Sequence, residues 1–272
     1  MYILMKILFL GDIIGIPGCN AVISHLPKII KKHQIDFVIV NGENCAESGM
    51  GITEEIANNL FKSGVNVITS GNHIWDQKET ATHIEKEDRL LRPYNSLEQT
   101  PGKGFKIYNL ENNFKICVLN LMGNIFMKKS KNVFKTAKKF LDNNYLKKNY
   151  DFLVVDFHTE TSTEKMAMGH FFDGKATLVV GTHTHVPTND ARILENGTAY
   201  QTDAGMTGNY DSVMGYDKNI FIKKFLKEEV TKNFPKKDNI SLCGVIVEAD
   251  LKTGLAKDIK SFIYSGVLKN FN

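Results

Sequence analysis

Short apolar runs recur along the chain, and each ends abruptly in a cluster of glycine, asparagine, aspartate or histidine. Continuous apolar runs of this length are typical of strands that are buried on both faces of a sheet. The pattern predicts strands over Lys6–Leu10, Asp36–Val40, Val65–Thr69, Phe152–Val155 and Ala176–Val180.

Segments with a helical spacing of apolar residues lie between the first three runs. The spacing predicts helices over Ala21–Lys32 and Thr53–Ser63, with Thr53 as the N-cap of the second. A further helix is predicted over Asn132–Lys148, which is rich in lysine on one side and apolar on the other. Strands that alternate with helices indicate an α/β fold with largely parallel strands.

The end of the chain has a different pattern. Two strand-like segments, Ser241–Ala249 and Ala256–Tyr264, flank a turn at Asp250–Gly254 and predict a hairpin. We therefore expect a second, mixed or antiparallel sheet at this end. No Pro/Ser-rich linker or low-complexity tract divides the sequence, which predicts a single domain over residues 1–272.

Composition and charge narrow the class of protein. The chain has 272 residues, 42% of them hydrophobic and 24% charged, as in ordinary globular proteins. The net charge is +4 and the lysines are scattered, so an obligate nucleic-acid partner is not indicated, whereas a small anionic substrate remains open. No apolar run reaches membrane-spanning length. The four cysteines are far apart, which indicates reduced thiols, and we therefore expect a cytoplasmic protein. The four are Cys19, Cys45, Cys117 and Cys243.

Polar side chains follow the predicted strands at the ends where open α/β sheets bind their ligands. Carboxylate, amide and imidazole groups there match the ligands of zinc, manganese and iron. His183 and His185, two apart in what we expect to be an extended segment, would point to the same side and chelate neighbouring ions. Taken singly, Asp12 could instead cap a helix and His158 could be a packed strand-end histidine. The full set is Asp12, Glu43, Asn44, Asn72, His73, His158, His183 and His185.

Other polar residues have weaker signals. We expect His25, His33 and His83 on solvated helix surfaces, and His170 as a packed side chain or pocket wall. Trp75 could stack on a base or pack under its loop. The loop that follows Asp203 could contact a substrate phosphate or form a structural turn.

The order of these motifs resembles that of the calcineurin-like metallophosphoesterase superfamily. Ile14 stands where that superfamily has a histidine, and Glu43 replaces its bridging aspartate. Both departures are similar to the YmdB-like bacterial branch, and the similarity covers almost the whole chain. The segments that carry it are Gly11–Gly18, Asn41–Asn44, Gly71–Asp76, Arg92–Asn95, Thr100–Gly104, Asp156–His158, Gly181–His185 and Thr202–Gly208.

The resemblance implies a four-layer α-β-β-α sandwich of two mixed sheets flanked by helices, with two metal ions. Asp12, Glu43, Asn44 and His185 would hold the first ion, and Asn44 would replace the missing histidine. Glu43, Asn72, His158 and His183 would hold the second, with Glu43 bridging. The ions are expected to be iron, with manganese or zinc as alternatives.

The resemblance further implies hydrolysis of phosphodiesters, with 2′,3′-cyclic nucleotides as the expected substrates. A hydroxide shared by the two ions would attack phosphorus, and His73 would protonate the leaving oxygen. Asp76 would orient His73. Two alternatives remain open, namely a metal-binding regulatory protein that acts through a partner, and a phosphomonoesterase or protein phosphatase. We expect no membrane partner, and homo-oligomerisation is left open.

Overall fold

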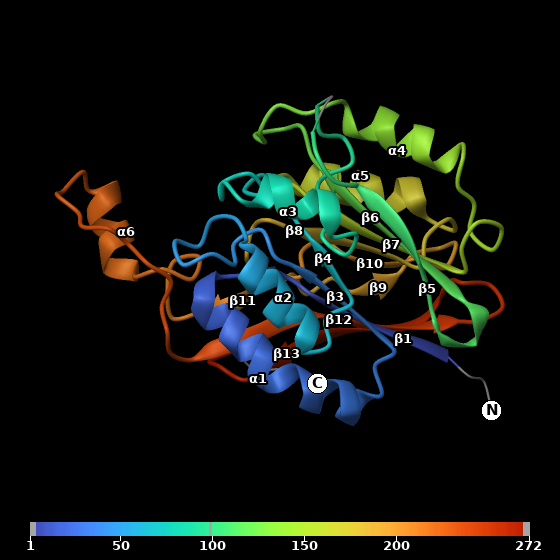
Figure 1. Ribbon diagram of the computed structural model, residues 1–272, viewed down its shortest axis with the longest axis horizontal. Coiled ribbons are helices and arrows are strands. Elements are labelled where there is room, and N and C mark those ends of the chain that lie inside the picture. The colour runs from blue at the N-terminus through green and yellow to red at the C-terminus, as the bar shows by residue number, and fades with distance from the viewer. Residues whose placement is uncertain (1–3, 98–99, 269–272) are drawn as a thin grey trace.

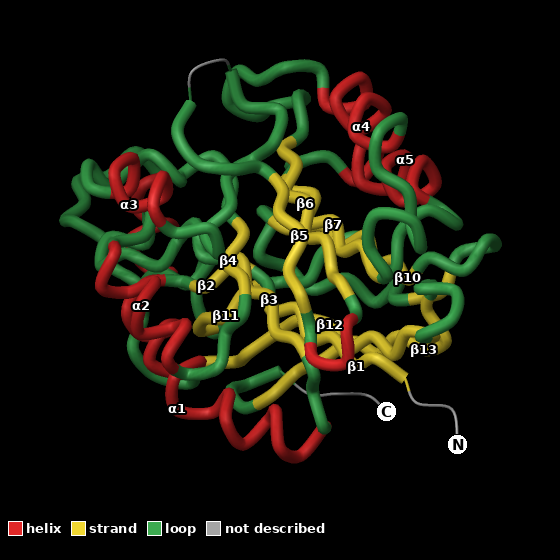
Figure 2. The backbone as a smooth tube through the Cα atoms, turned by 45° about the vertical axis from the view of Figure 1, so that its right-hand side comes forward, coloured by secondary structure: helices red, strands yellow, loops and turns green. Residues whose placement is uncertain are grey.

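Two facing sheets, with helices on their outer faces, make up the computed structural model, which describes residues 4–97 and 100–268 (Figure 1). Figure 2 shows the strands of both sheets between α1 and α2 on one side and α4 and α5 on the other. The predicted four layers of helix, sheet, sheet and helix are therefore confirmed.

The first sheet combines strands from both ends of the sequence. Within the described residues, its seven strands are β1 (Leu4–Leu10), β2 (Asp12–Ile13), β3 (Phe37–Asn41), β4 (Val67–Thr69), β11 (Met206–Asn209), β12 (Ile240–Asp250) and β13 (Ala256–Tyr264). β1, β3 and β4 are parallel neighbours. β12 pairs antiparallel with β1, β11 and β13.

The second sheet comes from the middle of the sequence. In the part of the chain that the structure describes, its six strands are β5 (Phe105–Asn109), β6 (Lys115–Met122), β7 (Phe152–His158), β8 (Leu178–Thr182), β9 (Arg192–Ile193) and β10 (Ala199–Gln201). β6, β7, β8 and β10 are parallel, whereas β5 and β9 pair antiparallel at the two edges.

The helices lie in two groups, apart from one that stands away from the body of the protein. α1 (Gly15–His33), α2 (Glu54–Lys62) and α3 (Thr80–Lys86) flank the first sheet, and α4 (Val133–Leu141) and α5 (Ser162–Phe172) cover the second. α6 (Lys218–Phe225) projects outward (Figure 1), and a 3-10 turn spans Glu111–Asn113. Within residues 4–97 and 100–268, none of the helices is both long and apolar enough to cross a membrane.

The apolar runs are buried on both faces, as predicted. In β1, Ile7 and Phe9 belong to the core between the two sheets. Leu8 and Leu10 point the other way, into the core beneath α1 and α2. Because successive side chains in a strand alternate between faces, one continuous apolar run serves two cores. A third core lies between the second sheet and helices α4 and α5.

Two of the predicted helices have different bounds in the structure. α1 begins at Gly15, earlier than predicted, because Pro17 sits in the first helical turn, where its missing N–H is not needed. α4 ends at Leu141 rather than at Lys148. The side-chain amides of Asn143 and Asn144 donate hydrogen bonds to the carbonyls of Lys139 and Phe140, which ends the helix there. The helix over residues 53–63 is confirmed, and the hydroxyl of its N-cap, Thr53, accepts a hydrogen bond from the backbone N–H of Ile56 (3.3 Å).

The C-terminal hairpin forms as predicted, but its place in the fold was predicted wrongly. β12 and β13 join the first sheet, where Leu4 faces Asp250 in the pairing of β1 with β12. They do not build a second sheet. β12 is buried on both faces and closes the side of β1 opposite β3, which a parallel α/β unit alone would leave open.

Candidate metal centre

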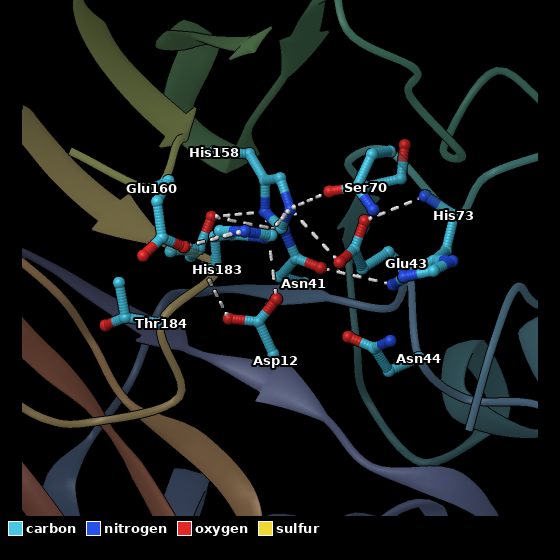
Figure 3. Close-up of polar contacts among 12 residues, drawn as sticks. Asp12, Asn41, Glu43, Asn44, Ser70, His73, His158, Glu160, His183 and Thr184 are labelled. Atoms are coloured by element: carbon cyan, nitrogen blue, oxygen red, sulfur yellow. Dashed lines mark hydrogen bonds and ion pairs between the residues drawn. The ribbon is translucent and has the colours of Figure 1, made fainter. Parts of the chain in front are cut away.

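The predicted site residues come together where strands of both sheets end. Asp12 follows β1, Glu43 follows β3 and Asn72 follows β4 in the first sheet. His158 is the last residue of β7, and His183 follows β8 in the second sheet. Figure 3 shows the side chains of Asp12, Glu43, His158 and His183 turned toward a common space, with Asn44 and His73 beside Glu43. Both sheets therefore contribute to one centre.

Four side chains converge on a single point, and we call them the convergent group: Glu43, Asn72, His158 and His183. The Nε2 atom of His158 lies 3.0 Å from Glu43 Oε1, 3.1 Å from Asn72 Oδ1 and 3.0 Å from His183 Nδ1. Ligands around an ion at about 2 Å lie about 3 Å from one another, so this spacing fits a metal. Among the described histidines, cysteines and acids, Glu43, His158 and His183 also satisfy the spacing of a metal cluster.

Three further side chains, the unpartnered group, share a different property. Asp12 Oδ1, Asn44 Oδ1 and His185 Nδ1 are buried atoms without a hydrogen-bond partner among the described residues. The Asn44 amide N–H donates to the carbonyl of Gly49 (2.8 Å), which leaves its oxygen free. Buried polar atoms are rarely left unpaired, because the loss of hydration is costly. All three atoms can donate electron pairs to a cation, so the group fits a metal ion.

A chain of hydrogen bonds fixes how His158 presents its ring. Thr182 donates its hydroxyl proton to Asp156 Oδ1 (2.7 Å), so its oxygen accepts from His158 Nδ1 (2.9 Å). Asp156 is held in turn by the Asn41 amide (2.9 Å) and the Thr69 hydroxyl. With the Nδ1 proton committed to Thr182, Nε2 is the nitrogen that faces the convergent group. Such outer partners commonly orient metal-binding histidines.

The charged groups of the centre shift one another's pKa values. Burial raises the pKa of the Asp12 carboxyl to about 8. Burial acts in the same direction on Glu43, but the neighbouring His158 outweighs it and lowers the pKa of Glu43 to about 2. Burial opposes the protonation of His158, yet Glu43 and Asp12 raise its pKa to about 9.

The two histidines after β8 have the opposite shift. Burial, together with the charge on His158, lowers the pKa of His183 to about 3. Burial lowers the pKa of His185 to about 4. Both imidazoles are therefore neutral near pH 7, the form in which a histidine binds metal.

The backbone around His183 and His185 differs from the predicted extended segment. β8 ends at Thr182, and the two histidines have positive φ angles of 99° and 63°. They lie in a tight turn, which directs His183 toward His158 and buries His185 deeper. The extended geometry predicted for the two histidines is therefore wrong, and their joint role as metal ligands stays a prediction.

Glycine is required beside Asn72 by close packing. A Cβ atom on Gly71 would lie 2.2 Å from His158 Cδ2 and 2.3 Å from Glu43 Oε2. Any larger residue would push into the convergent group. The glycine that precedes Asn72 and His73 is thus explained by contact with the site.

His73 lies at the edge of the centre. Its backbone N–H donates to Glu43 Oε2 (3.1 Å), and its Nδ1 lies 2.6 Å from Asp76 Oδ2. The ring is partly exposed, and the pairing with Asp76 leaves Nε2 as the outward nitrogen. The predicted orientation of His73 by Asp76 is present. Lys128 adds a contact to the same carboxylate, at 3.3 Å from Asp76 Oδ1, and donates to the Asn72 carbonyl (2.6 Å).

Several weaker predictions are decided by the structure. Asp12 does not cap α1, whose N-cap is Ile14, without a side-chain bond. His83 is buried and not solvated. His170 is exposed rather than packed. Trp75 is partly buried against the core beneath α1 and α2, which favours packing under its loop.

Residues that the sequence did not single out support the centre from outside. Asp156 had a usable signal, since it is an acid inside an apolar strand, two residues before His158. Thr182 and Asn41 lie in motif segments but were given no role of their own, because that role depends on contacts with residues far away in the sequence. Glu160, whose Oε2 lies 3.2 Å from His183 Nε2, and Lys128 were also missed, because both lie in loops.

Comparison with known proteins extends the likeness over the whole chain. The profile of the YmdB-like protein family matches residues 8–262. The 2′,3′-cyclic-nucleotide 2′-phosphodiesterase of Bacillus subtilis (strain 168) is 41% identical over 259 residues, which cover 95% of this chain and 97% of that protein.

Two crystal structures have the same fold. A protein from Thermus thermophilus matches with a TM-score of 0.87 and 35% identity, over 97% of this chain and 100% of that one. A phosphatase from Mycoplasma pneumoniae matches with a TM-score of 0.89 and 35% identity, over 98% of this chain and 95% of that one. The likeness therefore spans both sheets and is not confined to the motifs.

Proposed function

The chain belongs to the YmdB-like protein family, and on that premise we propose that it is a metal-dependent phosphodiesterase that hydrolyses 2′,3′-cyclic nucleotides. The B. subtilis relative bears the name of that activity. The observation that carries the proposal is the joint burial of convergent and unpartnered donor atoms in one centre. An apolar or purely structural site would leave these atoms without partners.

Two metal ions are proposed to occupy the centre. Glu43, Asn72, His158 and His183 would hold one ion, and Asp12, Asn44 and His185 would hold the other with Glu43 shared. The unpartnered group offers two oxygens and one nitrogen, a set that suits iron or manganese, with zinc as an alternative. His158 would release its Nε2 proton when a cation binds, because imidazole coordinates only through a free electron pair.

The protein groups around the centre have separate roles in the reaction. The ions, when bound, supply Lewis-acid chemistry that activates water and offsets negative charge on the phosphoryl oxygens. Water adds to phosphorus, and the bond from phosphorus to the 2′-oxygen breaks, which leaves a nucleoside 3′-phosphate. His73 donates a proton to that 2′-oxygen, and Asp76 holds the ring in place through Nδ1.

A substrate panel tests this function. The protein, stripped with a chelator and reloaded with Mn(II) or anaerobically with Fe(II), is incubated with 2′,3′-cAMP, bis-p-nitrophenyl phosphate and p-nitrophenyl phosphate. We expect metal-dependent hydrolysis of both diesters and slower hydrolysis of the monoester. Faster turnover of the monoester would favour a phosphomonoesterase. No turnover of any ester with either metal would overturn the enzymatic assignment and favour a regulatory metal protein.

A further inference from the structure

Asp203 and Lys165 form a buried ion pair beside the metal centre, outside the proposed ligands. Both side chains are 1% exposed, and Lys165 Nζ lies 2.5 Å from Asp203 Oδ2. We propose that this pair is a positioning device that fixes Asp12, His183 and His185 relative to one another for metal binding. The inference rests on the ligand assignment in the proposed function.

One oxygen of Asp203 holds the turn that carries both histidines. Asp203 Oδ2 accepts hydrogen bonds from the backbone N–H of Thr184 (3.2 Å) and from its hydroxyl (2.8 Å). Thr184 is the residue between His183 and His185, which both have positive φ angles. Residues other than glycine adopt such angles at a cost and need surrounding contacts to keep them there. Asp203 supplies those contacts at the centre of the turn.

The other oxygen of Asp203 leads to Asp12. Asp203 Oδ1 accepts from the backbone N–H of Gly205 (2.8 Å), and the carbonyl of Gly205 accepts from the backbone N–H of Asp12 (3.2 Å). The fit is close, since a Cβ atom on Gly11 would lie 1.9 Å from the Gly205 oxygen. A single carboxylate thus connects ligands that follow β1 in one sheet and β8 in the other.

Lys165 supplies the positive charge that balances the buried carboxylate of Asp203. A buried carboxylate without a countercharge is strongly destabilising, and Lys165 reaches it from helix α5. An ionised acceptor binds its donors more strongly than a neutral amide would. The sequence left the loop after Asp203 as either a phosphate contact or a structural turn. Its role is therefore structural, because it helps to position the proposed metal ligands.

Metal titration of matched variants tests the positioning role. Thr184→Val removes the hydroxyl that reaches the Asp203 carboxylate. Thr177→Val is the control, because it removes a buried hydroxyl whose hydrogen bonds, to Leu153 and Gly254, lie away from Asp203 and the centre. Stripped proteins are titrated with Mn(II), and binding is followed by calorimetry and by the metal-induced rise in Tm.

We expect Thr184→Val and Asp203→Asn to weaken binding of at least one ion by about 10–100-fold, as loss of outer partners does. Thr177→Val should keep the affinity of the unaltered protein, even where its Tm falls. Two ions bound with unaltered affinity by Thr184→Val and by Asp203→Asn would overturn the inference. So would an equal loss of affinity in Thr177→Val.

A double variant separates positioning from folding. Asp203→Asn leaves Lys165 buried without its partner and is expected to lower Tm, so Lys165→Met with Asp203→Asn removes both charges together. If the pair positions ligands, the double variant regains Tm while its Mn(II) affinity stays low. If affinity returns with Tm, the pair serves only the fold and the inference fails. Because binding is measured without substrate, these results remain decisive even if the protein hydrolyses no diester.

Discussion

The convergent and unpartnered groups of the candidate metal centre differ in how their side chains are held. In the convergent group, His158 Nε2 lies within 3.1 Å of three donor atoms, and Thr182 and Asp156 fix the ring from behind. In the unpartnered group, Asp12 Oδ1, Asn44 Oδ1 and His185 Nδ1 are buried and have no hydrogen-bond partners among the described residues. The side chains of the convergent group are held by contacts with one another, whereas those of the unpartnered group are held by the surrounding fold.

The two groups differ in how far hydrogen bonds offset the free-energy cost of burying their polar atoms. Hydrogen bonds among the side chains of the convergent group offset part of the free-energy cost of burying them. The unpartnered group has less of this offset: the backbone N–H of His183 donates to Asp12 Oδ2 (3.1 Å), but burial still raises the pKa of the Asp12 carboxyl to about 8. A cation would supply the missing interaction for both, but the unpartnered group depends on it more. Metal binding should therefore contribute to stability mainly through the unpartnered group.

The largest expected effect comes from replacing His158, because its Nε2 atom contacts every other member of the convergent group. His158→Ala should lower kcat/KM on 2′,3′-cAMP by about 1000-fold or more, since a catalytic metal supplies several kcal/mol of transition-state stabilisation. Metal content after gel filtration should fall in parallel. His170→Ala, an exposed histidine on α5, serves as the control and should keep both values. Retention of metal and activity by His158→Ala would disprove the central role of this group.

Much of this centre could be predicted from sequence because strand ends are a local signal. Asp12, Glu43, Asn72 and His158 each follow or end an apolar run, and ends of parallel strands meet at one edge of a sheet. The division into two groups could not be predicted. It depends on distances between side chains from different sheets, such as the 3.0 Å between His158 Nε2 and Glu43 Oε1.

The errors concern long-range pairing and backbone conformation. Nothing local to Ser241–Ala249 shows that this strand pairs with Leu4–Leu10, at the other end of the chain. The positive φ angles of His183 and His185 depend in the same way on Asp203, which lies beyond the next two strands. Local patterns determine which segments become strands and helices, while their partners are selected by the packing of the whole chain.

The second prediction separates function from stability in the unpartnered group. Asp12→Asn should lower kcat/KM by about 100-fold, because an ionised ligand is replaced by a neutral one. The same change should raise the Tm of the chelator-treated protein by about 3 °C or more near pH 8, because the cost of burying the charge disappears. Calorimetric melting with and without Mn(II) measures both effects, and Mn(II) should raise Tm less in the variant.

The pH dependence gives the sign of this stability effect. The pKa of Asp12 is about 8 in the folded chain, against an ordinary value of 3.8. Between these values the folded protein keeps a proton that the unfolded chain has released, so the stability of the unaltered protein falls as pH rises. The advantage of Asp12→Asn should therefore grow from pH 4 to pH 8. An advantage that shrinks over this range would contradict the burial cost.

The smallest effect is expected from the hydroxyl that orients His158. Thr182→Val leaves every proposed ligand in place but removes the acceptor for His158 Nδ1. We expect Mn(II) affinity and kcat/KM to fall by about 10-fold, at the lower end for outer partners of metal ligands. Thr177→Val is the matched control, because it also removes a buried hydroxyl with two hydrogen bonds, to Leu153 and Gly254, away from the centre. Both variants should lose Tm, and only Thr182→Val should lose metal affinity. Equal affinities in the two variants would mean that the convergent group is held by its mutual contacts alone, without the support of Thr182 and Asp156.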